Sequence, residues 1–134
     1  MTASRTIRVV AALIRDEAGR VLLVRKRGTS AFMQPGGKLD AGEDDVTALS
    51  REISEELGCL VVPASVRPLG AFDAAAANEP GFRVQANVYH VDVTGETSPR
   101  QEIDEAIWID PASPPNVHLA PLTRDHVLPL ALQP

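Results

Sequence analysis

Apolar residues dominate two short segments near the N-terminus, residues 7–15 and 21–27, which are separated by the turn-forming sequence Asp16-Glu17-Ala18-Gly19. Segments of this length on either side of a turn predict two strands of a hairpin. Alternate residues of the first segment form two sets, Ile7, Val9, Ala11 and Leu13 on one side and Val10, Ala12 and Ile14 on the other. Both sets are apolar, so we expect this strand to be covered on both faces.

A helical pattern follows over residues 44–57. Apolar residues recur at steps of three and four positions, namely Val46, Leu49, Ile53 and Leu57, and they predict one buried stripe. Acidic residues gather at the start of this segment and Gly58 follows its end, as is typical of helix termini. The sequence therefore predicts an amphipathic helix from Asp44 to Leu57.

The second half of the chain predicts two more strands and a helix. The strands are expected at 67–75 and 82–93, and in the second the apolar alternation shifts at Tyr89, which a β-bulge would explain. A turn-rich connection at 111–115 precedes a final helix at 122–132, which Pro129 should break or kink late. The order strand, strand, helix, strands, helix indicates an α/β fold with a mixed sheet between helices.

Length and composition limit the number of domains and the classes of binding partner. The chain has 134 residues, so we expect one domain spanning residues 1–134. Thirteen basic and eighteen acidic residues give a net charge of −5, which argues against stable nucleic-acid or membrane binding but not against a phosphate substrate held through cations. A single cysteine and an N-terminus without the apolar core of a signal peptide fit a cytoplasmic location.

Three carboxylates of the predicted helix share one side. At about 100° per residue, Glu52, Glu55 and Glu56 fall on one arc next to the apolar stripe. Such carboxylates repel one another unless a cation lies among them, and oxygen ligands suit Mg²⁺ or Mn²⁺. Arg51 precedes Glu55 by one helical turn and can orient its carboxylate. The alternative is a solvated acidic helix without a ligand.

The residues around these carboxylates form a longer motif. Gly37 is followed after five residues by Glu43, and after seven more by Arg51-Glu52, Ile53, Glu55-Glu56, Gly58 and Cys59. Residues Gly37 to Cys59 thus resemble the Nudix box, the signature of hydrolases that cleave nucleoside diphosphates linked to another group. The resemblance implies an α/β/α sandwich with a mixed sheet. The preceding turn, Gln34-Pro35-Gly36-Gly37, lets bare backbone approach a metal or a phosphate.

The resemblance also implies roles for the residues of the box. Mg²⁺ or Mn²⁺ would be bound by Glu52, Glu55, Glu56 and the carbonyl oxygen of Gly36, and Glu43 and Arg51 would support this loop and helix as a pair. Water would attack a phosphorus of a diphosphate bridge, and a carboxylate would accept its proton. Members of the family differ in the general base: Glu52 is the first choice, Glu55 the second, and Glu102 or Glu105 a third, with ordinary loop acids as the alternative for the last two.

Residues outside the box are candidates for binding the substrate. Arg25 or Arg27 could bind a phosphate or a base, Lys38 could reach a phosphate, and Asn87 could read a purine base from its strand. Glu102 and Glu105 belong to the acidic stretch before Trp108, and Trp108 itself is better explained as a core residue. For Arg25 and Arg27 a solvated strand edge remains the alternative.

The substrate is a small nucleotide in this interpretation. The sequence lacks the proline typical of ADP-ribose hydrolases and the tyrosine typical of dinucleoside polyphosphate hydrolases at the matching places, which leaves a MutT-like hydrolase of a nucleoside triphosphate or a related nucleotide. Hydrolysis of ADP-ribose, of a nucleotide sugar or of a dinucleoside polyphosphate remains an alternative. So does a non-catalytic nucleotide-binding regulatory module, although its members usually lose the three glutamates. An isomerase would require a longer chain and a catalytic cysteine, and homodimers are common in the family.

Overall fold

A computed structural model describes residues 5–133 of the chain. Its strands are β1 (Arg5–Leu13), β2 (Val21–Lys26), β3 (Phe32–Met33), β4 (Gly36–Lys38), β5 (Leu60–Val61), β6 (Arg67–Ala75), β7 (Phe82–His90), β8 (Val93–Thr94) and β9 (Ile103–Ile109). Its helices are α1 (Asp45–Leu57), a 3₁₀ turn at Pro63–Ser65, a π-helical segment η2 (Thr123–Val127) and α2 (Leu128–Ala131). The predicted first two strands, the helix after them and the strand at 67–75 are all confirmed.

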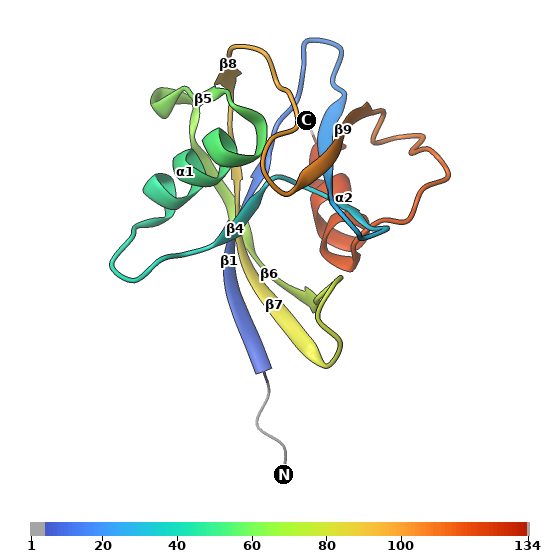
Figure 1. The fold of residues 1–134 in the computed structure, drawn as a ribbon. Coiled ribbons are helices and arrows are strands. Elements are labelled where there is room, and N and C mark those ends of the chain that lie inside the picture. The colour runs from blue at the N-terminus through green and yellow to red at the C-terminus, as the bar shows by residue number, and fades with distance from the viewer. Residues whose placement is uncertain (1–4, 134) are drawn as a thin grey trace.

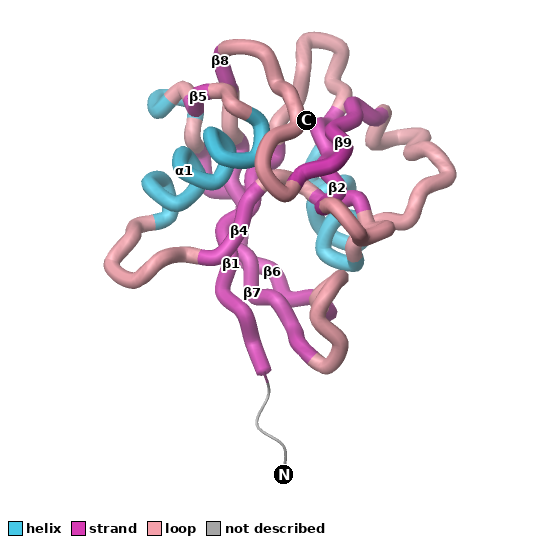
Figure 2. Tube along the Cα trace, viewed as in Figure 1, coloured by secondary structure: helices cyan, strands magenta, loops and turns pink. Residues whose placement is uncertain are grey.

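The strands form three small sheets. The largest has the order β4-β1-β7-β6 and is mixed, because β1 runs parallel to β7 while the other neighbours are antiparallel. Strands β3, β2 and β9 form an antiparallel sheet, and β5 pairs with β8. Helix α1 covers one side of the strands, and η2 with α2 covers the other (Figures 1 and 2). This is the predicted α/β/α sandwich with a mixed sheet.

Strand β1 is buried on both faces, as its alternation predicts. Ala11 and Leu13 pack into a core shared with the C-terminal helical segment, whereas Val10, Ala12 and Ile14 pack into a core under α1. All five side chains are at most 1% exposed. Strand β1 therefore lies between the two helical layers and contributes side chains to both cores.

Helix α1 begins and ends where its sequence predicts. The side chain of Asp44 accepts a 2.8 Å hydrogen bond from the backbone N–H of Thr47, and Gly58 ends the helix in the left-handed conformation at φ 72°. Leu49, Ile53 and Leu57 are fully buried, but Val46 is 41% exposed, so its predicted place in the buried stripe is wrong. In the first turns of α1, Asp45 faces β7 through a hydrogen bond from Asn87, and Ala48 is the buried apolar residue instead of Val46.

The predicted bulge near Tyr89 is present, but it lies in the neighbouring strand β6 and not in the strand that contains Tyr89. Strand β7 pairs with β1 in continuous register from Phe82 to His90, and the irregularity lies in its other neighbour, β6, between Pro68 and Gly70. The apolar alternation changes because the chain passes from one core to the other: Val84, Ala86 and Val88 face the C-terminal helical layer, and Tyr89, Val91 and Val93 face the layer of α1.

The C-terminal helix continues through Pro129 to Ala131, contrary to the predicted late break. The irregularity comes earlier, in η2, where the N–H of Leu128 bonds the carbonyl of Thr123 five residues before it. A proline lacks an N–H and crowds the preceding turn, and a wider π-helical turn accommodates it. No helix within residues 5–133 combines the length and the apolar character needed to cross a membrane.

Candidate active site

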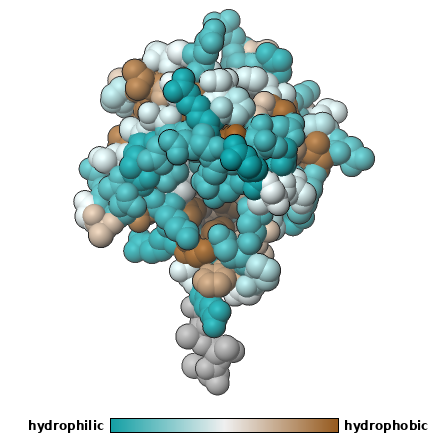
Figure 3. Space-filling model, in the orientation of Figure 1, coloured by the Kyte–Doolittle hydropathy of each residue, from teal (hydrophilic) through white to brown (hydrophobic). Residues whose placement is uncertain are grey.

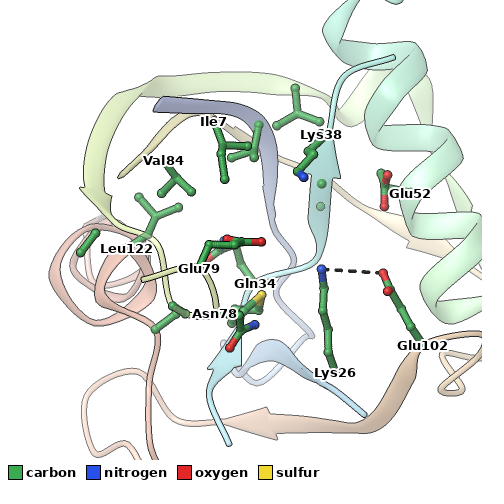
Figure 4. A pocket seen from close by; sticks show the side chains of 18 residues that line it. Ile7, Lys26, Gln34, Lys38, Glu52, Asn78, Glu79, Val84, Glu102 and Leu122 are labelled. Carbon is green, nitrogen blue, oxygen red and sulfur yellow. Dashed lines mark ion pairs between the residues drawn. The ribbon is translucent and has the colours of Figure 1, made fainter. Parts of the chain in front are cut away.

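A cavity of about 340 Å³ lies between β1, β4, β7, the β6–β7 loop and the C-terminal helical segment. At one end it is lined by Gly36, Gly37 and Glu52, and at the other by Glu79 and Leu122. Figure 4 shows these two ends on opposite sides of the cavity, with α1 beside Glu52. The space-filling view shows a hollow with hydrophobic surface inside and polar surface around it (Figure 3). A nucleotide-sized ligand suits such a cavity.

The two glycines of the box allow the chain to approach very closely at this point. A Cβ atom on Gly36 would lie 2.1 Å from the carbonyl oxygen of Val10, and φ of Gly36 is 144°. A Cβ atom on Gly37 would lie 2.5 Å from Cδ of Glu52. Both glycines belong to β4, which pairs with β1, so the predicted turn is in fact a short strand. Strand pairing therefore fixes the backbone directly against the Glu52 carboxylate.

Arg51 binds several groups of the box at once. Its guanidinium donates two 2.8 Å hydrogen bonds to Glu43, one of 2.9 Å to Glu52 and one of 3.1 Å to the carbonyl of Lys38. Arg51 also forms an ion pair with Glu55 one helical turn later, as predicted, but at 3.6 Å this contact is longer than a hydrogen bond, so Glu52 is held more closely than Glu55. The bonds from Arg51 lower the pKa of Glu43 to about 2 and, in turn, raise the pKa of Arg51.

The three carboxylates of the box differ in burial. Glu56 is 3% exposed and accepts a 3.3 Å hydrogen bond from the N–H of Gly36. Its burial, and next the charge of Glu52, raise the pKa of Glu56 to about 8; burial also raises the pKa of Glu52. The side chain of Glu55 is 49% exposed. As arranged here, no three His, Cys, Asp or Glu side chains of residues 5–133 surround a point where a metal ion would fit.

The chemistry of these groups nevertheless suits a divalent cation. A carboxylate as buried as Glu56, with a second carboxylate nearby, is unfavourable in its charged form without a positive charge next to it. Oxygen atoms are the preferred ligands of Mg²⁺ and Mn²⁺. Glu52 lines the cavity, and the half-exposed Glu55 lies one turn of α1 after the arginine that holds Glu52. The donor set therefore fits the metal that the sequence predicts.

Lys26 lies at the same end of the cavity as Glu52. It forms a 3.7 Å ion pair with Glu102, and both residues line the cavity (Figure 4). Sequence reasoning passed over Lys26 in favour of its two arginine neighbours. The signal was the alternation of β2, because Leu22 and Val24 face α1 and Lys26 follows on the same side.

Of the other predicted substrate-binding residues, Lys38 and Glu102 line the cavity, while Arg25, Arg27, Asn87 and Glu105 do not. Arg25 forms a 2.6 Å ion pair with Glu105, and Arg27 donates to the carbonyl of Gln101. Asn87 donates a 2.9 Å hydrogen bond to Asp45 at the start of α1. Its strand turns this side chain toward α1, away from the cavity, so its role as a base reader has no support in the structure.

Three polar residues of the cavity were not singled out from the sequence, namely Gln34, Asn78 and Glu79. Gln34 is 8% exposed, and its Oε1 accepts a 2.6 Å hydrogen bond from the buried hydroxyl of Thr123. Glu79 lies in the turn between β6 and β7, which a 3.1 Å bond from the N–H of Phe82 to its carbonyl closes. The sequence contains no local signal for these residues, because only the sheet order brings them together.

Comparison with known proteins identifies the family. The NUDIX domain profile matches residues 5–131. The chain is 39% identical over 66 residues to the 8-oxo-dGTP diphosphatase of Haemophilus influenzae, covering 46% of this chain and 48% of that protein. It is 40% identical over 62 residues to the RNA pyrophosphohydrolase of Halorhodospira halophila, covering 46% and 33%. The matches thus span about half or less of these two relatives.

A solved structure matches over nearly the whole length. The crystal structure of a MutT NUDIX hydrolase from Burkholderia pseudomallei superposes with a TM-score of 0.75 at 25% identity, covering 96% of this chain and 97% of that one. The residues of the box, the α/β/α sandwich and the profile match over residues 5–131 all indicate the same family. The chain belongs to the NUDIX domain family.

Proposed function

We propose that this protein is a pyrophosphohydrolase that requires Mg²⁺ or Mn²⁺ and cleaves a diphosphate bridge of a nucleoside triphosphate or a related nucleotide. One observation carries the proposal: Glu52 and the two glycines of the box open into the same cavity as an apolar end that suits a base. The similarity to an 8-oxo-dGTP diphosphatase supports a nucleoside triphosphate, and the similarity to an RNA pyrophosphohydrolase supports a triphosphate end as the reacting group.

Glu52, Glu55, Glu56 and the carbonyl oxygen of Gly36 would hold the cation. When bound, it supplies an acidified water and neutralises the charge that develops on the phosphate oxygens. Lys26 and Lys38, which line the cavity on either side of this site, would bind phosphate oxygens. Lys26 would exchange its partner Glu102 for the substrate.

Proton transfer would fall to a carboxylate at the same end of the cavity. Glu52 is the first candidate, because it lines the cavity and is held by Arg51 at 2.9 Å. Glu55 is the second candidate, and Glu102, also in the cavity, is the third. Glu105 is held by Arg25 away from the cavity, so we retain it in no role.

The test is turnover by glutamine variants. Glu52→Gln and Glu56→Gln should each lower kcat by at least about 100-fold, the usual contribution of a general base or a metal ligand. Glu17→Gln, which changes an exposed residue in the β1–β2 turn, is the matched control. Circular dichroism checks the fold, and Mn²⁺ titration followed by electron paramagnetic resonance checks metal binding. Near-normal rates in both variants with metal present would show that the site is assigned wrongly.

The substrate is identified by a panel. Unmodified and oxidised nucleoside triphosphates, ADP-ribose, diadenosine polyphosphates, nucleotide sugars and 5′-triphosphate RNA are each incubated with Mg²⁺ and with Mn²⁺. Release of pyrophosphate or phosphate identifies both the substrate and the bridge that is cleaved. We expect the fastest release from a nucleoside triphosphate. Binding of nucleotides without any release would instead support the non-catalytic regulatory module.

A further inference from the structure

The end of the cavity opposite the box carries a pair of polar groups with opposite hydrogen-bonding character. Figure 4 shows Glu79 pointing into the cavity from the β6–β7 loop, and Gln34, Ile7, Val84 and Leu122 among the other side chains that line it. All five residues line the same cavity as Glu52. A nucleotide with its phosphates at Glu52 would therefore place its base between apolar side chains and these two polar groups.

The orientation of the Gln34 amide is fixed. Its Oε1 accepts a 2.6 Å hydrogen bond from the hydroxyl of Thr123, which is fully buried. The amide oxygen is thus engaged on the side of η2, and the amide nitrogen, which can only donate, remains for a ligand in the cavity. Gln34 acts there as a hydrogen-bond donor.

Glu79 contributes the opposite character. An ionised carboxylate has only acceptors, and it can receive two parallel N–H groups at once. The turn that carries Glu79 is closed by two backbone bonds, from Phe82 to Glu79 at 3.1 Å and from Ala76 to Phe82 at 3.0 Å. The carboxylate is therefore presented from a defined loop and not from a free tail.

We propose that Glu79 and Gln34 read the Watson–Crick edge of a guanine base. Guanine presents one acceptor, O6, next to two donors, N1–H and the 2-amino group, and this pattern matches the amide nitrogen of Gln34 next to the carboxylate of Glu79. Adenine and cytosine place a ring acceptor where guanine has N1–H, so the carboxylate would repel them. Uracil offers a single ring N–H. Because oxidation at C8 leaves this edge unchanged, Glu79 selects guanine in both its normal and oxidised forms. This inference rests on the proposed function for the position of the phosphates.

The experiment compares kcat/KM for GTP, ITP and ATP in the wild type, Glu79→Gln and the control Glu17→Gln. Inosine lacks the 2-amino group, so the wild type should prefer GTP over ITP and ATP by about 10- to 100-fold, the usual value of a bidentate contact to a base. In Glu79→Gln the preference of GTP over ITP should fall to nearly one, and the rate with ATP should rise, because no carboxylate then repels the ring acceptor of adenine. The variant should lower dGTP and 8-oxo-dGTP turnover by the same factor.

Two results would overturn the assignment. An equal loss for GTP, ITP and ATP would place Glu79 at the ribose, and no loss for any of them would remove it from the binding site. Gln34→Met, which keeps the length of the side chain but removes the amide, should lower GTP turnover and leave ATP turnover nearly unchanged.

Direct binding separates this inference from the proposed function. Titration calorimetry with GMP and AMP requires no turnover, and it should show tighter binding of GMP in the wild type and a smaller preference for GMP in Glu79→Gln, where Gln34 still donates to O6. If GMP is preferred but no triphosphate is hydrolysed, the proposed function fails and the base assignment stands. If triphosphates are hydrolysed and GMP is not preferred, the base assignment fails and the function stands.

Discussion

The guanidinium of Arg51 donates a 2.8 Å hydrogen bond to each carboxylate oxygen of Glu43, eight residues earlier in the chain. A third bond, of 2.9 Å, reaches Glu52. Glu43 lies in the loop before α1, whereas Arg51 lies on α1 itself. The pair therefore joins the loop to the helix, and the arginine that makes this joint also holds a carboxylate of the active site.

The stabilisation that Glu43 contributes through Arg51 should be lost in acid. Its hydrogen bonds from Arg51 lower its pKa from 4.5 to about 2 in the folded state, so the unfolded chain binds the proton first as the pH falls. The stabilisation is complete above pH 4.5 and is lost as the pH falls toward 2. Urea unfolding between pH 2 and 6 should show this loss in the wild type and a flatter profile in Glu43→Gln. Equal slopes in the two proteins would contradict the assignment, and Glu17→Gln serves as the control.

The two glycines of the box should fail in different ways when replaced by alanine. In Gly37→Ala the new Cβ meets the end of the Glu52 side chain, which can move aside at little cost in stability. We expect a folded protein whose turnover falls at least about 10-fold, because a carboxylate displaced by a fraction of an ångström loses its alignment. Thermal unfolding and kcat measure the two effects.

Gly36→Ala is the matched comparison. Its Cβ would contact the main-chain carbonyl of Val10, and its φ of 144° is strained for any other residue. Both groups belong to paired strands, so the contact cannot be relieved by moving a side chain. We expect a loss of about 2–4 kcal/mol in the free energy of unfolding, by strain of the backbone and disruption of the pairing between β4 and β1. Should Gly36→Ala unfold at the same denaturant concentration as Gly37→Ala, the close contact with β1 would be wrong.

The elements with local signals could be predicted from the sequence. Helix α1 combines an apolar period with Asp44 and Gly58 at its ends, and β6 has its predicted limits. The two-sided burial of β1 follows from alternation alone. The residues of the Nudix box are also close in sequence, within one loop and one helix. The pairing of Glu43 with Arg51, eight residues apart, could therefore be predicted.

Features that depend on distant segments could not be predicted. The shift of apolar positions at Tyr89 comes from a change of core and not from a bulge in its own strand. Gln34 and Glu79 line one cavity because β1 pairs with both β4 and β7, and Lys26 reaches the same cavity from β2 in another sheet. Asn87 was a candidate for this cavity, but its side chain lies on the other face of β7, bonded to Asp45. The face on which a polar strand residue lies depends on which layer covers it.

Thr123 should support the orientation of Gln34. Thr123→Val keeps the shape but removes the hydroxyl that donates to Gln34, leaving a buried amide oxygen without its partner. We expect a loss of about 1–3 kcal/mol in the free energy of unfolding. The double variant Thr123→Val/Gln34→Met removes both partners and should recover part of that loss. A double-mutant cycle by urea unfolding measures the coupling, and a coupling near zero would contradict the hydrogen bond.

His90 should make stability depend on pH in the weakly acidic range. Its Nε2 lies 3.2 Å from Asp92, while its buried Nδ1 has no hydrogen-bond partner within residues 5–133. Burial lowers the pKa of His90 below 6.5, and the charges of Arg67 and Arg15 act in the same direction against the opposing effect of Asp92. Protonation would place a proton on Nδ1 with no acceptor to receive it.

These contacts determine the direction in which the stability of the protein changes with pH. The unfolded chain binds the proton at a higher pH than the folded protein does, so stability is complete above pH 6.5 and decreases as the pH falls below it. In His90→Gln, whose amide can still donate to Asp92, the decrease should be smaller. His118 and His126 are present in both proteins, so the difference between the two unfolding profiles from pH 5 to 8 isolates His90. If the two stability profiles run parallel, the pKa of His90 does not differ between the folded and unfolded states. That result would contradict the absence of a hydrogen-bond partner for Nδ1 within residues 5–133.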